Sequence, residues 1–360
     1  MRARGRALAR SAVALAATVL LGSSALPALA GVDAPFDPRA LAVHVQGNHL
    51  VDGTAQAIRL LGVNFSGAEY ACAQGWGIFA GPNDAKAIHA MSTWDINAVR
   101  VPLNEDCWLG INGVKKRYSG ERYRKAISGL VQRLHAAGLY VILDLHWNAP
   151  GGQKALDQQL MADADHSPEF WTSVATRFRD DPALLFDLYN EPHGISWTCW
   201  LNGCKTKQDW QAAGMQQLVD AVRSTGATQP LMLGGLNWSS LLGNGWLKHA
   251  PQDPAGQLVA SFHLYNFGGC DKPCWRTQVG GVAKHVPVVT GELGEDDCAH
   301  GFIDRYMPWA DQRGISYLGW SWNVTSCRKG PSLITNAKKG TPTDFGLGLR
   351  DHLQALAGVS

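Results

Sequence analysis

Two glutamates follow apolar runs in which a charged side chain is unexpected. Glu191 ends the run LFDLYNEP, between Asn190 and Pro192, and Glu292 lies near the end of the run PVVTGELG. Burying a carboxylate is costly unless the group is paired or has a chemical task. Two carboxylates that face each other can act as a nucleophile and as a general acid and base in one reaction. We therefore interpret Glu191 and Glu292 as a catalytic pair; the alternative is that each is an ordinary surface carboxylate at the start of a loop.

Eight apolar runs of strand length alternate with helical patterns along the chain. Residues 121–138, for example, place four apolar side chains on one helix face before Gly138. Runs that are apolar on both faces are typical of parallel strands, and eight of them predict an α/β fold, a single-domain (β/α)8 or TIM barrel. An N-terminal β-hairpin is expected before the barrel. The predicted barrel strands are residues 58–66, 97–103, 140–147, 184–192, 230–238, 258–266, 287–294 and 314–323.

Polar and aromatic side chains gather at the C-terminal ends of these predicted strands, which is where barrel active sites lie. They are Arg100, His146, Asn190, Glu191, His263, Tyr265, Glu292, Trp320 and Trp322. Arg100 is flanked by apolar residues, so it needs a partner charge; a purely stabilising ion pair would satisfy it as well as a site would. His146 and His263 could instead be core histidines or metal ligands.

The strand-end motifs resemble a known family. In chain order, NAVRVPL, ILDLHW, LYNEP, SFHLYN, TGELGE and YLGWSWN are similar to the strand signatures of glycoside hydrolase family 5, the cellulase family of retaining (β/α)8 glycosidases. The similarity covers nearly the whole chain after residue 30. It implies an enzyme that hydrolyses β-linked polysaccharides or oligosaccharides by double displacement and needs no cofactor. An endo-β-1,4-glucanase is the first choice, with exo action or a mannan, xyloglucan, β-1,3-glucan, β-1,6-glucan or glycoconjugate substrate as alternatives.

The resemblance also implies a role for each strand-end residue. These roles are acid/base for Glu191, nucleophile for Glu292, a contact to the sugar 2-hydroxyl for Asn190, support of the nucleophile for Arg100 and Tyr265, contacts to sugar hydroxyls and the acid/base for His146 and His263, and a platform under the sugar for Trp320. Trp322 is the second candidate for that platform, since residues two apart on a strand share a face. Repulsion between the two carboxylates is expected to raise the pKa of Glu191.

Rival functions leave weaker traces in the sequence. A metal-dependent barrel hydrolase would need a ligand set, and Asp144-x-His146 is the nearest approach to one; we expect no metal. A serine hydrolase would need a G-x-S-x-G elbow, which the sequence lacks. A sugar-binding barrel without catalysis remains an alternative, although both carboxylates are present.

Aromatic residues in the predicted loops are candidate walls of sugar-binding subsites, because sugar C–H faces pack on aromatic rings. The candidates are Trp76, Trp108, Trp147, Trp200, Trp238 and Trp275. Residues 149–165, after the third predicted strand, either overhang the cleft or form an ordinary insertion.

Residues 1–30 have the layout of a secretory signal peptide, with four arginines before an apolar run that ends in Ala28-Leu29-Ala30. Removing them takes four positive charges and no negative one, so the formal charge falls from +2 to −2. We therefore expect a secreted, extracellular catalytic domain over residues 31–360. No nucleic-acid partner, no membrane contact after cleavage and a monomer are also expected.

Eight cysteines, an even number in an exported chain, favour disulfides over a zinc site. Short spacing favours Cys199 with Cys204 and Cys270 with Cys274. Elimination then pairs Cys72 with Cys107 and Cys298 with Cys327.

Overall fold

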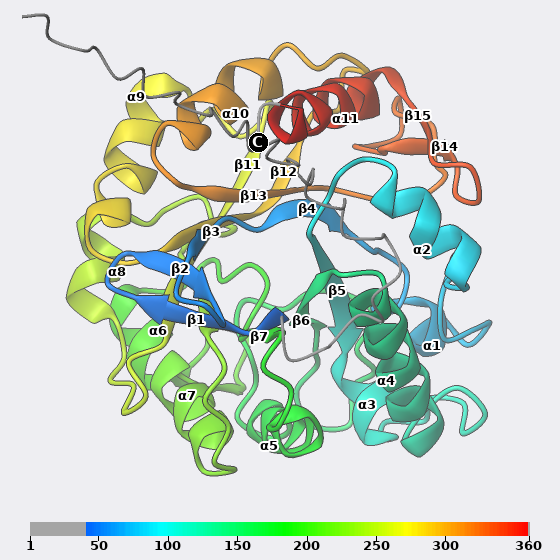
Figure 1. Cartoon of the computed structure of the whole chain (residues 1–360). Helices are drawn as coiled ribbons and strands as arrows, with labels where there is room; N and C mark the ends of the chain where they lie inside the picture. The colour runs from blue at the N-terminus through cyan, green and yellow to red at the C-terminus, as the bar shows by residue number, and fades with distance from the viewer. Residues whose placement is uncertain (1–40, 359–360) are drawn as a thin grey trace, which may run out of the picture. The chain divides into compact units, whose positions relative to one another are not determined.

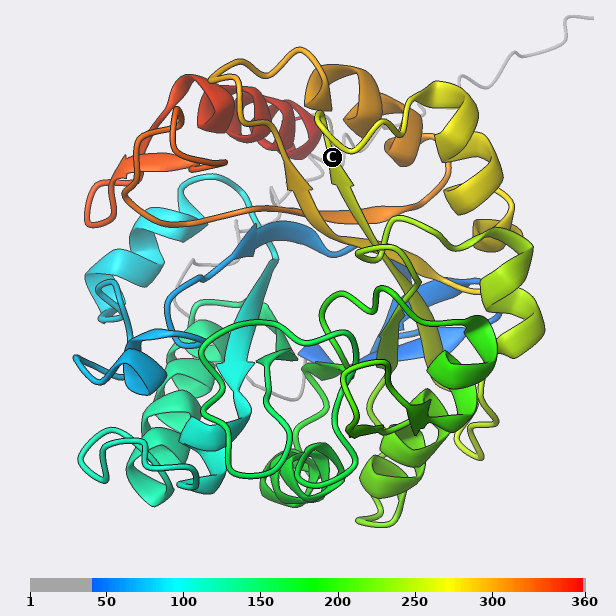
Figure 2. The same ribbon diagram turned by 180° about the vertical axis from the view of Figure 1, so that it is seen from behind.

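The computed structural model describes residues 41–358, so the predicted signal segment 1–30 lies outside it. Eight parallel strands close into a barrel, which confirms the predicted fold (Figures 1 and 2). Each strand pairs with its neighbours in chain order, and the last pairs with the first. The barrel strands are β4 (Leu61–Asn64), β5 (Ala98–Asn104), β6 (Tyr140–Trp147), β7 (Leu184–Asp187), β10 (Leu231–Gly234), β11 (Leu258–Tyr265), β12 (Val288–Gly294) and β13 (Ser316–Gly319).

Helices cover the outside of the barrel. The predicted helix over 121–138 is α4 (Glu121–Ala136), whose apolar face is buried. It ends before Gly138, whose φ of 79° lies in the left-handed region that glycine adopts without strain. The other outer helices are α2 (Ala85–Ser92), α5 (Ser167–Phe178), α7 (Met215–Arg223), α8 (Gly243–His249), α10 (Ile303–Asp311) and α11 (Asp344–Ala357).

The predicted N-terminal hairpin is present and has a third short strand. β1 (Val43–Gln46), β2 (His49–Asp52) and β3 (Ala57–Ile58) form an antiparallel sheet that lies in front of the barrel in Figure 1. Val43 and Leu50 of this sheet pack in one cluster with inward-facing residues of the barrel strands. The sheet therefore closes the N-terminal end of the barrel with apolar surface and leaves the other end for chemistry.

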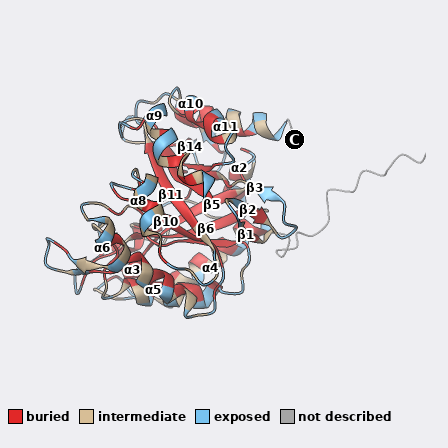
Figure 3. Ribbon diagram, turned by 90° about the vertical axis from the view of Figure 1, so that its left-hand side faces the viewer, coloured by how far each residue is buried: buried red, intermediate tan, exposed pale blue. Residues whose placement is uncertain are grey.

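Both faces of the barrel strands are buried, as the red strands in Figure 3 show. One apolar cluster fills the space between the strands and the helices, and a second fills the inside of the barrel at its N-terminal end. This explains why the strands read as continuous apolar runs, and why the polar residues among them stand out.

Short elements decorate the loops. They are α1 (Ala71–Gln74), α3 (Glu105–Leu109), α6 (Trp197–Asn202), α9 (Lys272–Cys274), η2 (Trp275–Val279), η3 (Val282–Lys284), and the strand pairs β8 (Cys204–Lys205) with β9 (Gln211–Ala212) and β14 (Ile334–Asn336) with β15 (Thr341–Pro342). Four disulfides staple these loops, and all four predicted pairings are confirmed. Within residues 41–358, no helix combines the length and apolarity that a membrane crossing requires.

Five predicted strands end earlier than expected, and three of them, β7, β10 and β13, end four or five residues early. β7 ends at Asp187, so Glu191 lies four residues beyond the regular strand, and Trp320 and Trp322 likewise follow the end of β13. After β7 the chain stays attached to the barrel, since Leu188 N donates to the Met232 carbonyl at 2.9 Å. The prediction that the strand itself carries Glu191 is therefore wrong, because an extended continuation of β7 delivers it.

Candidate active site

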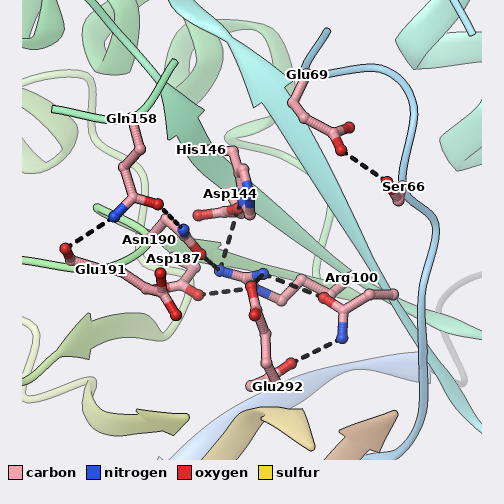
Figure 4. A network of polar contacts seen from close by, with 12 residues as sticks. Ser66, Glu69, Arg100, Asp144, His146, Gln158, Asp187, Asn190, Glu191 and Glu292 are labelled. Atoms are coloured by element: carbon pink, nitrogen blue, oxygen red, sulfur yellow. Dashed lines mark hydrogen bonds and ion pairs between the residues drawn. The ribbon is translucent and has the colours of Figure 1, made fainter. Parts of the chain in front are cut away.

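Arg100 organises the C-terminal end of the barrel. It projects from β5, is fully buried, and contacts side chains from several strands (Figure 4). Burial alone would lower the pKa of Arg100, but the surrounding carboxylates raise it above its ordinary value. The predicted need for a partner charge is thus met by three carboxylates and two amides. The contacts run to Asp187 Oδ2 at 2.9 Å, Asp144 Oδ2 at 3.1 Å, Glu292 Oε1 at 2.9 Å, Asn190 Oδ1 at 2.9 Å and Asn64 Oδ1 at 3.1 Å.

Glu292, on β12, has both carboxylate oxygens occupied. Oε1 accepts from Arg100, and Oε2 accepts from the Tyr265 hydroxyl at 2.5 Å. The side chain is only 5% exposed. Arg100 and Tyr265 therefore fix the Glu292 carboxylate in one orientation, in agreement with the expected support of this residue.

Glu191 faces Glu292 across a short gap. One carboxylate oxygen from each glutamate and one ring nitrogen of His263 all lie within 4.8 Å of one another. His263 Nδ1 is 2.8 Å from Glu191 Oε1 and 3.5 Å from Glu292 Oε2. Two residues that are a hundred positions apart in the sequence thus meet at one point of the barrel end.

The glycines of the TGELG motif explain how this geometry is possible. A Cβ atom on Gly294 would lie 2.6 Å from Tyr265 Cε1, and one on Gly291 would lie 3.2 Å from His263 Nε2. Glycine at these two positions lets the rings of β11 approach β12 closely enough to reach the carboxylates. The motif therefore has a packing reason as well as a chemical one.

His146 and Trp320 form a second wall of the site. Their rings stack with centroids 5.3 Å apart and an interplanar angle of 6°. His146 Nδ1 lies 2.7 Å from Asp144 Oδ2. Burial would lower the pKa of His146, but the charge and the hydrogen bond of Asp144, together with the charges of Glu292 and Glu69, raise it above its ordinary value.

Glu191 and His263, which contact each other, both have pKa values shifted from their ordinary ones. Burial raises the pKa of Glu191 to about 7, against the opposing effects of His146 and Arg100. Burial also lowers the pKa of His263 to about 4, so its ring is neutral near pH 7. The predicted direction for Glu191 is confirmed, but the predicted cause is wrong. Desolvation raises this pKa, rather than repulsion from the second carboxylate.

A cavity of about 500 Å³ opens directly above the two glutamates. Its lining includes every predicted site residue except Arg100 and Trp322, both of which are buried. The lining residues are His146, Gln158, Asn190, Glu191, Asn237, Trp238, Ser240, His263, Leu264, Tyr265, Phe267, Gly268, Cys270, Glu292 and Trp320. A larger hollow of about 920 Å³ between α4 and α5 contains none of the predicted site residues.

The tryptophan candidates divide into two groups. Trp108, Trp200 and Trp275 are buried in the core, and Trp322 packs edge-on against Trp94, so their prediction as sugar-contacting residues is wrong. These large apolar rings are buried in the core even though some of them belong to loop segments.

The remaining tryptophan candidates lie near the surface. Trp238 is 50% exposed and stacks on His193, at the edge of the cavity. Trp76 is equally exposed, and Tyr70 lies between it and Trp147. Exposed rings thus remain available both at the cavity edge and elsewhere among the loops.

Sequence reasoning missed four polar residues of this network: Asn64, Asp144 as a partner of Arg100, Gln158 and Asp187. The two aspartates carried a usable signal, because each is a carboxylate inside a buried strand next to a motif residue. Gln158 carried no such signal, since no sequence pattern predicts the path of the long segment in which it lies. Of the two alternatives for residues 149–165, the structure favours the overhang, because Gln158 lines the cavity.

The same geometry could hold a cation. Among residues 41–358, Glu191, His263 and Glu292 are the group whose ligand atoms are close enough to share a metal ion. Arg100, at 2.9 Å from Glu292, already neutralises one of these carboxylates and would repel a cation there. The predicted Asp144 and His146 pair is turned to Arg100 and to each other rather than to an open ligand position.

Comparison with known proteins identifies the relatives of this chain. The sequence profile of the cellulase family, glycosyl hydrolase family 5, matches residues 51–326. Endoglucanase CelA of Streptomyces lividans is 24% identical over a stretch that covers 78% of this chain and 56% of the relative. A mannan endo-1,4-beta-mannosidase of Cellvibrio japonicus is 23% identical, with 84% and 64% covered. The chain therefore spans less than two thirds of the length of either relative.

A solved structure supports the fold. The β-glucanase SdGluc5_26A from Saccharophagus degradans, in complex with cellotetraose, superposes with a TM-score of 0.68 at 19% sequence identity. The superposition covers 91% of this chain and 98% of that one.

Proposed function

The chain belongs to glycosyl hydrolase family 5, the cellulase family, and from this premise we propose that it is a retaining β-glycoside hydrolase with Glu292 as nucleophile and Glu191 as acid/base. One observation carries the proposal: carboxylate oxygens of the two glutamates lie within 4.8 Å of each other. Retaining glycosidases hold their carboxyl groups about 5–5.5 Å apart, whereas inverting ones need about 6.5–9.5 Å to admit a water. The observed gap fits direct attack by a carboxylate.

In the first step, Glu292 attacks the anomeric carbon while the glycosidic C–O bond breaks. Glu191 gives its proton to the departing oxygen. With a pKa of about 7, Glu191 still carries that proton at mildly acidic pH. Arg100 and Tyr265 keep the Glu292 carboxylate aimed at the reacting carbon.

In the second step, the Glu191 carboxylate takes a proton from water, whose oxygen attacks the anomeric carbon and releases Glu292. His263 supports this stage. Its Nδ1 faces both carboxylates while Nε2 has no hydrogen-bond partner, so the ring proton is best placed on Nδ1. Nδ1–H can then donate to the Glu191 carboxylate after that residue has lost its proton.

We propose a β-1,4-glucan as the substrate, cleaved within the chain. The endoglucanase relative and the glucanase that binds cellotetraose support this choice. Trp238 and Phe267, at 50% and 62% exposure, line the cavity and leave its edge open to a long chain. The mannosidase relative makes β-mannan the second candidate. Asn190 would contact the 2-hydroxyl at which glucose and mannose differ.

The proposal is tested by hydrolysis of β-1,4-glucan, β-mannan and aryl glycosides, with products sized by chromatography and the anomer of the first product read by NMR. Wild type should give mixed oligomers from one polymer with retention of configuration. Glu292→Ala should lose activity. Glu191→Ala should also lose activity, and it should recover part of its own activity when azide replaces water as the nucleophile. An inverted product, or a Glu292→Ala variant as active as wild type, would exclude this mechanism. Binding without hydrolysis by wild type would instead favour a sugar-binding barrel.

We also propose that the protein is exported and monomeric. The signal-like pattern of residues 1–30 and the four disulfides support export, because disulfides persist in oxidising compartments. N-terminal sequencing of the secreted protein should place its first residue near Gly31. Light scattering should give the mass of one chain. A full-length chain retained inside the cell would contradict export.

A further inference from the structure

Gln158 connects the segment after β6 to the extended continuation of β7 that carries Glu191. Its Oε1 accepts a hydrogen bond from Asn190 Nδ2 at 2.5 Å, and its Nε2 donates to the main-chain carbonyl of Glu191 at 3.0 Å. Figure 4 shows this side chain above the two residues. A single amide thus holds both members of the Asn-Glu pair.

The contact decides how the Asn190 amide is oriented. Asn190 Oδ1 accepts from Arg100 Nη2 at 2.9 Å, and Nδ2 donates to Gln158. A flipped amide would place its NH2 group against a guanidinium that can only donate, and its oxygen against an acceptor. The two neighbours therefore select one orientation, in which the second Nδ2 hydrogen remains available to a ligand in the cavity.

The segment around Gln158 is fixed on both sides. Before it, both main-chain groups of Ala155 are bonded to side chains at the end of β5 and the start of α3, each at 2.8 Å. After it, the Gln159 carbonyl accepts from the Tyr189 hydroxyl at 2.7 Å. Because its backbone is held in this way, Gln158 can impose an orientation on Asn190 rather than follow it.

We propose that Gln158 is a positioning residue, which fixes the Asn190 amide and the main chain at Glu191 in the reactive geometry. The inference rests on the proposed function and adds a residue to it. Small displacements of positioned groups lower the rate of the chemical step more than they weaken substrate binding. Hydrogen bonding by Gln158 also lowers the pKa of Glu191 against the effect of burial.

The test compares Gln158→Met with Gln153→Ala. Methionine keeps the length of the side chain and removes both hydrogen bonds, while Gln153 is an exposed glutamine in the same segment. On the polymer that wild type cleaves, Gln158→Met should lower kcat about tenfold with KM changed by less than about twofold. Its alkaline pH limit should move upward, since a donor near Glu191 is lost. The Gln153→Ala control should match wild type.

A double-mutant cycle separates positioning from general damage to the fold. In an Asn190→Ala background, Gln158→Met should lower kcat by a smaller factor than in wild type, because one of the two groups that Gln158 positions is gone. An equal loss in both backgrounds with an unmoved pH limit would overturn the proposal, as would a Gln158→Met variant as active as wild type. If wild type itself hydrolysed no substrate, the proposed function would fail before this inference was reached.

Discussion

Replacing Glu191 with glutamine should stabilise the protein, and the gain should grow with pH. Burial raises the pKa of Glu191 from its ordinary value of 4.5 to about 7. The folded chain therefore binds this proton more tightly than the unfolded chain does. Stability from Glu191 is fully present below pH 4.5 or so and is lost as the pH rises through about 7. Glutamine has similar size and does not titrate, so it escapes this loss.

The expected size follows from the shift. One pKa unit corresponds to about 1.36 kcal/mol, so a shift from 4.5 to about 7 makes the wild type lose about 3 kcal/mol between about pH 4.5 and about pH 8. Urea unfolding of both proteins at the two pH values measures it. The difference between variant and wild type should increase by about that amount, because the titrations of groups remote from Glu191 cancel.

Glu169→Gln is the matched control, since Glu169 is exposed in the first turn of α5. Its effect on the free energy of unfolding should change much less between the two pH values than that of Glu191→Gln, because Glu169 is exposed to solvent. If Glu191→Gln behaved in the same way as this control, burial would not hold the proton on Glu191, and the account of its role as acid would be wrong.

Further predictions concern the groups around the pair. The alkaline limit of kcat/KM should lie near pH 7, where Glu191 loses its proton. A pH–rate series on an aryl glycoside with a good leaving group should show that Glu191→Ala lacks this limit. Arg100→Lys should lower activity by about a hundredfold or more and unfolding free energy by about 3 kcal/mol, because one ammonium cannot satisfy three buried carboxylates; a variant with unchanged denaturation midpoint would contradict this. Gly294→Ala should lower activity about as much as Tyr265→Phe, since its Cβ would lie 2.6 Å from the Tyr265 ring. Dialysis against a strong chelator should leave activity unchanged, and restoration of a lost activity by a divalent cation would instead favour a metal site at the two glutamates.

Sequence patterns determined the barrel because parallel strands buried on both faces must be apolar throughout, which makes each one visible as a run. The same logic exposed the site, since Arg100, Glu191 and Glu292 interrupt or end runs that exclude charge. The disulfide pairing followed from spacing and elimination. Strand ends were less visible, because the continuation after β7 keeps its hydrogen bonds and its apolar pattern without remaining a regular strand.

The tertiary structure decided how close these residues come and what their surroundings do to them. Contacts between segments far apart in the chain decide what causes the pKa shift of Glu191 and whether each tryptophan is buried or exposed. They also bring Asp187 and Gln158 into the site. A tryptophan in a loop can turn inward or outward with the same neighbours in sequence, and only packing selects between them. Gln158 became part of the site because hydrogen bonds from three other elements hold its segment over the barrel end, and a local pattern cannot encode such contacts.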